Sequence, residues 1–372
     1  MSYIHRKPDW PAFHWSDQQL TSAVAAVRHR QGRLIGRMES LGFSLRAEAV
    51  LETLTEDVLK SSEIEGELLD KEQVRSSIAR RLGMDVVGLV PADRSVEGVV
   101  EMMLDATQNF AAPLTKERLF DWHAALFPTG RSGMTKIIVG EWRDDANGPM
   151  QVVSGPIGRE RVHFEAPAAQ TLEPEMRAFL IWFEGKAEFS RTNIDPVLVA
   201  GIAHLWFVTI HPFDDGNGRI ARAIADHALA RSEQSGQRFY SMSAQIRVER
   251  NAYYDALEAT QKGDLNITAW LVWFLDCLDR AIDGAETVLA SVMHKARFWD
   301  RLREQPFNER QRNMLNRLLN GFEGKLNSSK WAKISKCSPD TALRDIDDLM
   351  KRGIMVKGAA GGRSTHYVLS ET

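Results

Sequence analysis

Residues 211–222 read His211-Pro-Phe-Asp-Asp-Gly-Asn-Gly-Arg-Ile-Ala-Arg222, and they lie between an apolar helical run and an alanine-rich one. His211 precedes a proline, which disfavours the helical conformation at the histidine, so the incoming helix is expected to end there. The Gly-Asn-Gly of residues 216–218 then leads into a helix beginning near Arg219. Because backbone N–H groups at a helix start bind anions, the stretch predicts two helices joined by an anion-binding turn.

Charged side chains in this stretch point to phosphate chemistry. Arg219 and Arg222 share one face of the first helical turns, where positive charge is unfavourable against the helix dipole unless an anion is present. Asp215 is a hard oxygen ligand of the kind that holds Mg²⁺ when phosphates complete the coordination. His211 titrates near neutrality and is a candidate proton acceptor. A metal site formed by His204 and His211 is an alternative with only two ligands, so we interpret His204 as a hydrogen-bonded core histidine.

Composition limits the class of protein. The 372 residues predict two or three domains, and 44% hydrophobic with 26% charged residues is typical of a globular chain. A formal net charge of −3 excludes a protein that works mainly by coating nucleic acid. With only two cysteines, no signal-peptide pattern and no apolar run long enough to cross a bilayer, we expect a cytoplasmic protein.

Apolar periodicity predicts a chain that is mainly helical. Helical spacing covers residues 17–81, 172–183, 196–210, 219–231, 253–262 and 267–303. Residues 137–167 instead hold short β-branched runs at 138–140, 151–155 and 162–164, separated by turn residues, which predicts an embedded β-hairpin. Residues 308–372 predict a separate unit of three helices and a Gly-rich hairpin, with twelve Lys and Arg against seven Asp and Glu.

Residues 211–222 match, at every specified position, the motif HxFx(D/E)GNGRxxR of the Fic family. Doc-type kinases of the same fold resemble this motif but carry Lys where this chain has Gly218. The resemblance therefore implies a Fic-fold helical core and a protein adenylyltransferase, which transfers AMP from ATP to a Ser, Thr or Tyr hydroxyl of a target protein. A toxin-like kinase is disfavoured by Gly218.

The resemblance also implies a role for each motif residue. His211 would be the general base that takes the proton of the target hydroxyl. Asp215 would hold Mg²⁺ between the α- and β-phosphates of ATP. Arg219 would neutralise the negative charge of the β- and γ-phosphates. Such chemistry depends mainly on positioning and charge neutralisation.

The remaining motif residues are assigned to the loop itself. Gly216 and Gly218 would supply backbone N–H donors, and the Asn217 side chain would bind an α-phosphate oxygen. Phe213 is expected to be a core anchor that fixes the loop.

Two further segments resemble parts of Fic proteins that surround the nucleotide. Residues 151–155 resemble a β-hairpin flap that clamps a target segment by strand addition. Residues 251–258 resemble the element beside the adenine base, although tyrosines at this spacing also fit core packing. The ATP-binding residues expected from both segments are Val152, Val153, Ser154, Gly155, Tyr253, Tyr254 and Gln261.

Residues 61–66 match the family's inhibitory motif (S/T)xxxE(G/N), with Ser61, Glu65 and Gly66 at the specified positions. The Glu65 carboxylate would pair bidentately with Arg222 and occupy the place of the γ-phosphate, so the enzyme would be self-inhibited. The same glutamate in relatives can orient a water for AMP removal. Neighbouring Glu63 and Glu67 are expected to belong to a solvated acidic turn.

The tail resembles a winged helix-turn-helix, with residues 338–352 as its recognition-like helix and residues 356–369 as its wing. DNA contact would rest on Thr341, Arg344 and Arg363. Acidic residues on the same helix argue against DNA binding; they are Asp340, Asp345, Asp347 and Asp348.

The expected domains are an N-terminal helical region with the inhibitory motif (1–95), a Fic catalytic domain (96–283), a linker helix (284–305) and the winged helix (306–372). Expected partners are an unknown target protein, the protein itself as a self-modification target, a second copy in a homodimer, and DNA. The alternative function is a DNA-binding transcriptional regulator in which the Fic core senses a nucleotide.

Overall fold

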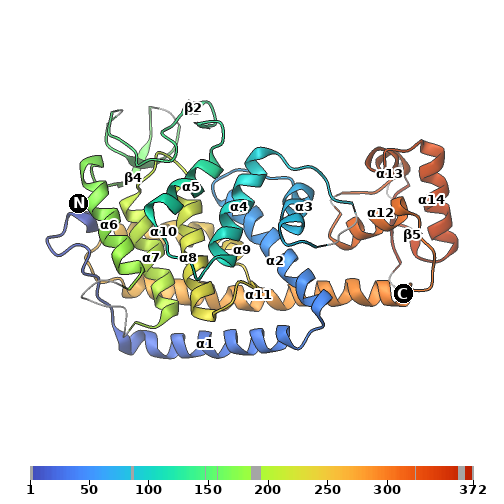
Figure 1. Ribbon diagram of the computed structural model, residues 1–372, viewed down its shortest axis with the longest axis horizontal. Helices are drawn as coiled ribbons and strands as arrows, with labels where there is room; N and C mark the ends of the chain where they lie inside the picture. The colour runs from blue at the N-terminus through green and yellow to red at the C-terminus, as the bar shows by residue number, and fades with distance from the viewer. Residues whose placement is uncertain are drawn as a thin grey trace. The chain divides into compact units, whose positions relative to one another are not determined.

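The computed structural model describes residues 3–84, 88–146, 148–156, 158–185, 194–322, 324–358 and 365–370, and most of them are helical (Figure 1). The chain divides into two compact units, one of Met1–Met84 and Val90–Val292 and one of Asp85–Leu89 and Met293–Thr372. The predicted mainly helical class is confirmed. The domain boundaries expected at residues 95, 283 and 305 stay predictions. None of the helices in the described ranges combines the length with the apolar character that a membrane crossing requires.

The helices of the first unit cover most of its length, and α11 continues into the second unit. In chain order they are α1 (Asp17–Glu39), α2 (Phe43–Ile64), α3 (Lys71–Arg81), α4 (Arg94–Gln108), α5 (Lys116–Leu126), α6 (Leu172–Phe183), α7 (Pro196–Ile210), α8 (Asn217–Glu233), α9 (Met242–Val248), α10 (Arg250–Gln261) and α11 (Thr268–Arg301), with short 3-10 turns η1 (Ile4–Arg6) and η2 (Ala169–Thr171).

Helix α7 is the buried centre of the first unit. Every residue after Pro196 is buried, as expected for a helix that is apolar on all sides. Its start is fixed by Pro196 at the first position and by Asp195, whose side chain accepts a hydrogen bond from the backbone N–H of Val197 at 2.9 Å. The helix packs along α8 (Figure 1). The predicted bounds of α6 and α7 are confirmed, whereas α8 begins at Asn217, earlier than the predicted start near Arg219.

Short antiparallel strands interrupt the helices between α5 and α6. Strand β3 (Gln151–Ser154) pairs with β4 (Arg161–Glu165), which confirms the predicted hairpin there, and β1 (Arg131–Ser132) pairs with β2 (Thr135–Lys136). The strand expected at residues 138–140 does not form, so that prediction is wrong. The N–H of Ile138 instead donates to the Asp214 carboxylate at 2.8 Å, which ties this segment to the loop after α7.

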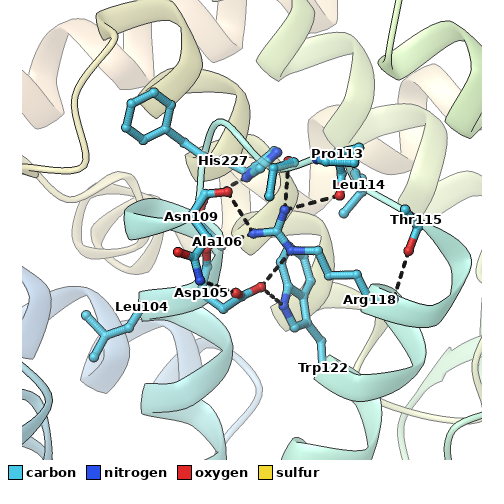
Figure 2. A network of polar contacts seen from close by, with 12 residues as sticks. Leu104, Asp105, Ala106, Asn109, Pro113, Leu114, Thr115, Arg118, Trp122 and His227 are labelled. Carbon is cyan, nitrogen blue, oxygen red and sulfur yellow. Dashed lines mark hydrogen bonds and ion pairs between the residues drawn. The ribbon is translucent and has the colours of Figure 1, made fainter.

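A polar network fixes α4 against α5 (Figure 2). Arg118 on α5 donates from Nε to Asp105 Oδ2 at 2.6 Å and from Nη2 to the Asp105 carbonyl at 2.8 Å. Trp122, one turn further along α5, donates to the same carboxylate at 2.7 Å. Burial alone would raise the pKa of Asp105, but hydrogen bonds from Asn109, Arg118 and Trp122 hold this pKa below its ordinary value. The carboxylate is therefore charged, and α5, which carries residues of the site below, is held firmly.

Within the described residues after α11, the second unit has three helices followed by a strand pair, as predicted for residues 308–372. These elements are α12 (Glu309–Leu319), α13 (Ser328–Ile334), α14 (Pro339–Lys351), β5 (Met355–Lys357) and β6 (Tyr367–Leu369). They surround a core that includes Leu315, Trp331 and Ile346. The Gly-rich segment between the strands, with Arg363, lies outside the described residues, and the assignment as a winged helix stays a prediction.

Candidate active site

A cavity of about 530 Å³ brings most of the predicted site residues together. The loop after α7, the β3–β4 hairpin, the end of α2 and helix α10 all contribute to its wall. Of the predicted residues, those that line it are Glu65, Val152, Val153, Ser154, His211, Asp215, Gly216, Asn217, Gly218, Tyr253, Tyr254 and Gln261. Ser61, Gly66, Gly155, Arg219 and Arg222 are not part of this wall.

His211 ends α7 in a left-handed conformation with φ 53°, so the chain turns sharply at the imidazole. Its Nδ1 lies 3.2 Å from the carbonyl oxygen of Val208, and because a carbonyl only accepts, Nδ1 carries the proton. Nε2 is then the proton acceptor of a ring that lines the cavity. Burial and the nearby Arg143 lower the pKa of His211 to about 4. The ring is therefore neutral near pH 7 and can take a proton.

Arg143 holds the turn at His211 and was not recognised from sequence as a site residue. Its guanidinium is buried and donates from Nε to the His211 carbonyl at 2.8 Å and from Nη2 to the Pro167 carbonyl at 2.6 Å. Its Nη1 pairs with Asp145 at 2.9 Å. Nothing in the local pattern distinguishes this arginine from a surface arginine, because the two carbonyl groups that it binds come from distant segments.

His123 on α5 is a second residue that sequence analysis missed. Its ring stacks on Phe213, with centroids 4.2 Å apart and planes 10° from parallel. Nδ1 accepts from the Gly140 N–H at 3.2 Å, so Nε2 carries the proton that it donates to the Asp215 carbonyl at 3.2 Å. Burial lowers the pKa of His123 to about 4. A neutral histidine thus links the loop to the segment before the hairpin, and Phe213 is the buried anchor that was predicted.

The loop geometry depends on two glycines. Gly216 has φ +82°, and a Cβ there would lie 2.9 Å from the Phe127 ring. A Cβ on Gly218 would lie 2.2 Å from Glu65 Oε1, so the carboxylate sits directly against the first turn of α8. The Asn217 side chain lines the cavity and also braces the loop, and its role at a phosphate oxygen stays a prediction. Its Oδ1 accepts from the Phe213 N–H at 3.0 Å and its Nδ2 donates to the Phe213 carbonyl at 2.7 Å.

Glu65 pairs with Arg222, but through one contact rather than the predicted bidentate pair. Arg222 Nη2 lies 2.8 Å from Glu65 Oε1, and Nη1 is buried without a hydrogen-bond partner. Ser61 holds the same guanidinium, accepting from Nε with its hydroxyl at 3.0 Å and from Nη2 with its carbonyl at 2.8 Å. A buried arginine with an unused donor beside a helix N-terminus is suited to an anion. Gly66, with φ +85°, turns the chain immediately after the carboxylate.

Glu63 and Glu67 both form ion pairs, which the expectation of a solvated acidic turn did not include. Glu67 lies 2.6 Å from Arg219 Nη1, and Glu63 contacts Lys60 at 2.7 Å and Arg247 at 2.9 Å. Arg219 pairs with Glu67 and lines a neighbouring cavity, whereas Arg222 is not part of that wall. The arginines share a helix face but have different carboxylate partners.

Comparison with known proteins assigns part of the chain to a family. The Fic/DOC family matches residues 113–229, which include the whole loop and most of the cavity wall. This segment is a Fic/DOC family domain. A domain of unknown function, DUF4172, matches residues 3–84, which include the segment with Ser61 and Glu65.

Curated relatives match the Fic domain over part of their length. A protein named protein adenylyltransferase Fic from Nematostella vectensis is 31% identical over 131 residues, covering 35% of this chain and 28% of that protein. A protein of the same name from Aedes aegypti is 32% identical over 117 residues, which cover 32% of this chain and 21% of that protein. A uridine 5'-monophosphate transferase from Xanthomonas campestris pv. campestris (strain 8004) is 30% identical over 128 residues, covering 32% and 22%. The matched region thus spans between 21% and 28% of these relatives.

Solved structures resemble the chain over a longer range. A Fic family protein from Desulfovibrio desulfuricans G20 aligns with a TM-score of 0.53 and 20% identity, covering 96% of this chain and 98% of that one. A Fic domain containing signaling protein from Bacteroides thetaiotaomicron VPI-5482 aligns with a TM-score of 0.52 and 19% identity. The alignment covers 71% of this chain and 97% of that one. At this identity the likeness establishes the fold, and the predicted Fic-fold helical core is confirmed.

Asp215 is the predicted Mg²⁺ ligand of the Fic domain. Its Oδ1 accepts from the Gly216 N–H at 2.6 Å and its Oδ2 accepts from the Ser132 hydroxyl. Among the described residues there is no group of three or more His, Cys, Asp or Glu side chains that could hold a metal ion by itself. A single carboxylate does fit Mg²⁺ when phosphate oxygens and water complete the octahedron, since Mg²⁺ is commonly bound in this way.

The tyrosines of α10 take different positions. Tyr253 is buried, and its hydroxyl lies 2.9 Å from His204 Nε2, which confirms His204 as a hydrogen-bonded core histidine. Burial lowers the pKa of His204 to about 3 and raises the pKa of Tyr253. Tyr254 is partly buried, with the Arg250 guanidinium 5.1 Å from its ring centroid. Gln261 donates to the Thr209 hydroxyl at 3.3 Å. A role of these residues beside a base stays a prediction.

The predicted DNA-contact residues lie in the second unit. Thr341 is in the first turn of α14, where its N–H donates to the Ser338 hydroxyl at 3.2 Å, and Arg344 is exposed on the same helix. Asp345, which was expected to oppose DNA binding, is instead buried and paired with Arg310 at 2.7 Å. Asp348 pairs with Arg352 at 2.7 Å. Part of the expected acidic charge of α14 is therefore neutralised within the unit.

Proposed function

We propose that this protein transfers the nucleotidyl group of a nucleoside triphosphate, AMP from ATP, to a Ser, Thr or Tyr hydroxyl of a protein. Support comes from the Fic domain and from relatives named adenylyltransferases. One relative is named for UMP transfer, so the choice of ATP is part of the proposal. The main structural support for nucleotidyl transfer is that the neutral ring of His211 and the start of α8 line the same cavity.

In this reaction the target hydroxyl oxygen attacks the α-phosphorus, and pyrophosphate leaves. His211 Nε2 takes the hydroxyl proton, and the backbone N–H groups of Gly216 and Gly218 face the phosphate oxygens. Mg²⁺ held through Asp215 would neutralise phosphate charge. Arg222 and Arg219 supply the remaining positive charge once their carboxylate partners move.

Self-inhibition by Glu65 is part of the proposal. Its carboxylate contacts Arg222 and lies against Gly218, where it takes the place of a phosphate group at the start of α8. Loss of this carboxylate removes the anion that pairs with Arg222 Nη2, beside the unpartnered Nη1. Nucleotide transfer should therefore rise when Glu65 is replaced by Gly.

The test is intact mass spectrometry after incubation with Mg-ATP. Parent protein, Glu65→Gly, His211→Ala in the Glu65→Gly background, and Glu63→Gln are compared. Glu63 is a matched control because it lies in the same segment but pairs with Lys60 and Arg247. We expect AMP on Glu65→Gly or on an added cell lysate, much less with parent and Glu63→Gln, and none without His211. The proposal is abandoned if Glu65→Gly neither labels protein nor releases pyrophosphate.

We extend the proposal to AMP removal. A carboxylate beside the phosphate-binding loop can accept a proton from a water molecule that attacks the same phosphorus. Pre-labelled protein should then lose AMP with parent protein and keep it with Glu65→Gln. Equal rates of loss would limit Glu65 to inhibition.

DNA binding by the second unit is a second candidate function. It is favoured by the pairing of Asp345 with Arg310, which removes one carboxylate from the exposed charge of α14. Phosphate contacts make affinity fall steeply with salt. A shallow salt dependence, or unchanged DNA affinity in Arg344→Ala, would argue against DNA contact through this helix.

A further inference from the structure

A serine, a histidine and a glutamate form a hydrogen-bonded chain at the edge of the cavity. The Ser154 hydroxyl oxygen at the end of β3 lies 2.6 Å from His163 Nε2, and His163 Nδ1 lies 2.6 Å from Glu258 Oε2 on α10. Nucleophile, base and orienting carboxylate thus stand in the order that activates a serine hydroxyl. All three residues line the cavity that also holds His211 and the phosphate-binding loop.

The position of His163 follows from a β-bulge. Val152 pairs with Phe164 and Val153 pairs with Val162, so His163 is the extra residue on β4. A bulge redirects a side chain, and such features are frequent beside active sites. Without the bulge the strand register would shift, and His163 would not be held at the unpaired position opposite the end of β3.

Glu258 fixes the state of the histidine. Hydrogen bonds from Lys262, His163 and Arg161, in this order of effect, lower the pKa of Glu258 to about 2, so the carboxylate is charged throughout the neutral range. A carboxylate only accepts, and His163 therefore carries a proton on Nδ1. When Nδ1 carries the single ring proton, Nε2 is the acceptor and the Ser154 hydroxyl donates to it. Ser154 is an exposed hydroxyl with a base already in contact.

We propose that Ser154 is an internal acceptor of the transferred nucleotide, with His163 as its base and Glu258 as the residue that positions His163. This inference rests on the proposed nucleotidyl transfer. The Ser154 oxygen forms a bond to the α-phosphorus of ATP, and the bond from that phosphorus to pyrophosphate breaks. The hydroxyl proton passes to His163 Nε2 and then to water. The products are Ser154 carrying AMP and free pyrophosphate.

Modification of Ser154 would change the hairpin that faces the cavity. The hydroxyl is at the end of β3, and Gly155 follows with φ +103° in the turn. An esterified Ser154 no longer donates to His163, and it adds a bulky anion to the edge of the site. The hairpin would then be less able to admit a target segment, so self-modification should limit transfer to other proteins.

The experiment uses full-length Glu65→Gly protein with Mg-ATP, followed by peptide mapping of the AMP-bearing residue and a separate measurement of pyrophosphate. We expect AMP on Ser154, on the replacement hydroxyl at the same position in Ser154→Thr, and nowhere in the hairpin of Ser154→Ala. Ser40→Ala, which removes an exposed hydroxyl that donates only to the Arg37 carbonyl, is the matched control and should label like the Glu65→Gly parent. His163→Gln should label Ser154 about 100-fold more slowly, because it loses the base.

Protein dilution adds an independent readout. A fractional labelling rate that does not change with protein concentration supports transfer within one molecule, and a rate that falls in proportion overturns it. AMP found only on other residues or on added acceptor protein overturns the assignment of Ser154 while leaving nucleotidyl transfer intact. The absence of both label and pyrophosphate overturns the proposed function itself.

Discussion

Substitution of His123 tests how the loop that carries His211 is held. His123 is fully buried, and its ring links the Gly140 N–H to the Asp215 carbonyl. The two contacts can be removed separately. Gln places an amide N–H near the position of Nε2 and keeps the donor to Asp215, whereas Asn places its oxygen near the position of Nδ1 and keeps the acceptor for Gly140.

Each variant should lose about 1–3 kcal/mol of unfolding free energy, because one buried polar group is left without its partner. His123→Phe retains the stack on Phe213 but loses both contacts, so it should be the least stable of the three. For nucleotidyl transfer in the Glu65→Gly background, we expect His123→Gln to retain more activity than His123→Asn. The contact that His123→Gln keeps is the one to the loop that carries His211 and Asp215.

The pH dependence of stability gives a second readout of the same residue. Folding lowers the pKa of His123 from 6.5 to about 4, so between these values the unfolded chain binds more protons than the folded one. The contribution of neutral His123 to the unfolding free energy is therefore fully present above pH 6.5 and is lost as the pH falls toward 4. A pKa difference of this size corresponds to about 3 kcal/mol of unfolding free energy from His123. His123→Gln should lose less stability than the parent over this window.

The assay is urea unfolding at several pH values between 4.5 and 7.5, about the range in which His123 contributes. His29→Gln, which removes an exposed histidine on α1, is the control and should leave the pH slope unchanged. The reasoning is refuted if His123→Gln and His123→Asn are as stable as the parent, or if the pH slope of His123→Gln equals that of the parent.

Three further predictions follow from other contacts of the site. Glu65→Gln should bind ATP about tenfold more tightly than the parent, since it weakens the competition for Arg222, while adenosine affinity stays the same; titration calorimetry measures both, and a parallel gain for adenosine would contradict the explanation. Arg143→Met should lower the unfolding free energy by about 2–4 kcal/mol, because the Pro167 and His211 carbonyls lose a buried donor; thermal unfolding that matches the parent would be the contrary result. Gly216→Ala should lower stability by about 1–3 kcal/mol through the positive φ and the contact with Phe127, and urea unfolding indistinguishable from the parent would show that the loop relaxes at no cost.

The sequence predicted helices well where a proline or a glycine sets the end of the helix. Pro196 and the proline after His211 delimit α7, and Gly216 permits the turn that begins α8. The strand expected at residues 138–140 failed, because the N–H of Ile138 is used by Asp214 from another segment. Short apolar runs cannot show where their hydrogen-bond partners come from.

The site residues, like the helices and strands, were predicted where the signal is local and missed where it is not. The motif residues were found because they are contiguous, and the positions of Val152 and Ser154 beside the cavity agree with the expected flap. The contacts of the Asn217 amide with Phe213 were not expected, although both residues lie within the same loop. His123 and Arg143 were missed, because no local pattern separates a buried positioning residue from a solvated one.

By itself, therefore, the sequence determined the helical class, the turn between α7 and α8, and the identity of the candidate base. Those features depend on backbone preferences and spacing within a dozen residues. Only the tertiary structure decided that Glu65 lies against Gly218 through a single contact to Arg222, and that His163 joins Ser154 to Glu258. These contacts join segments far apart in the chain, and packing of the whole unit, rather than local propensity, sets their geometry.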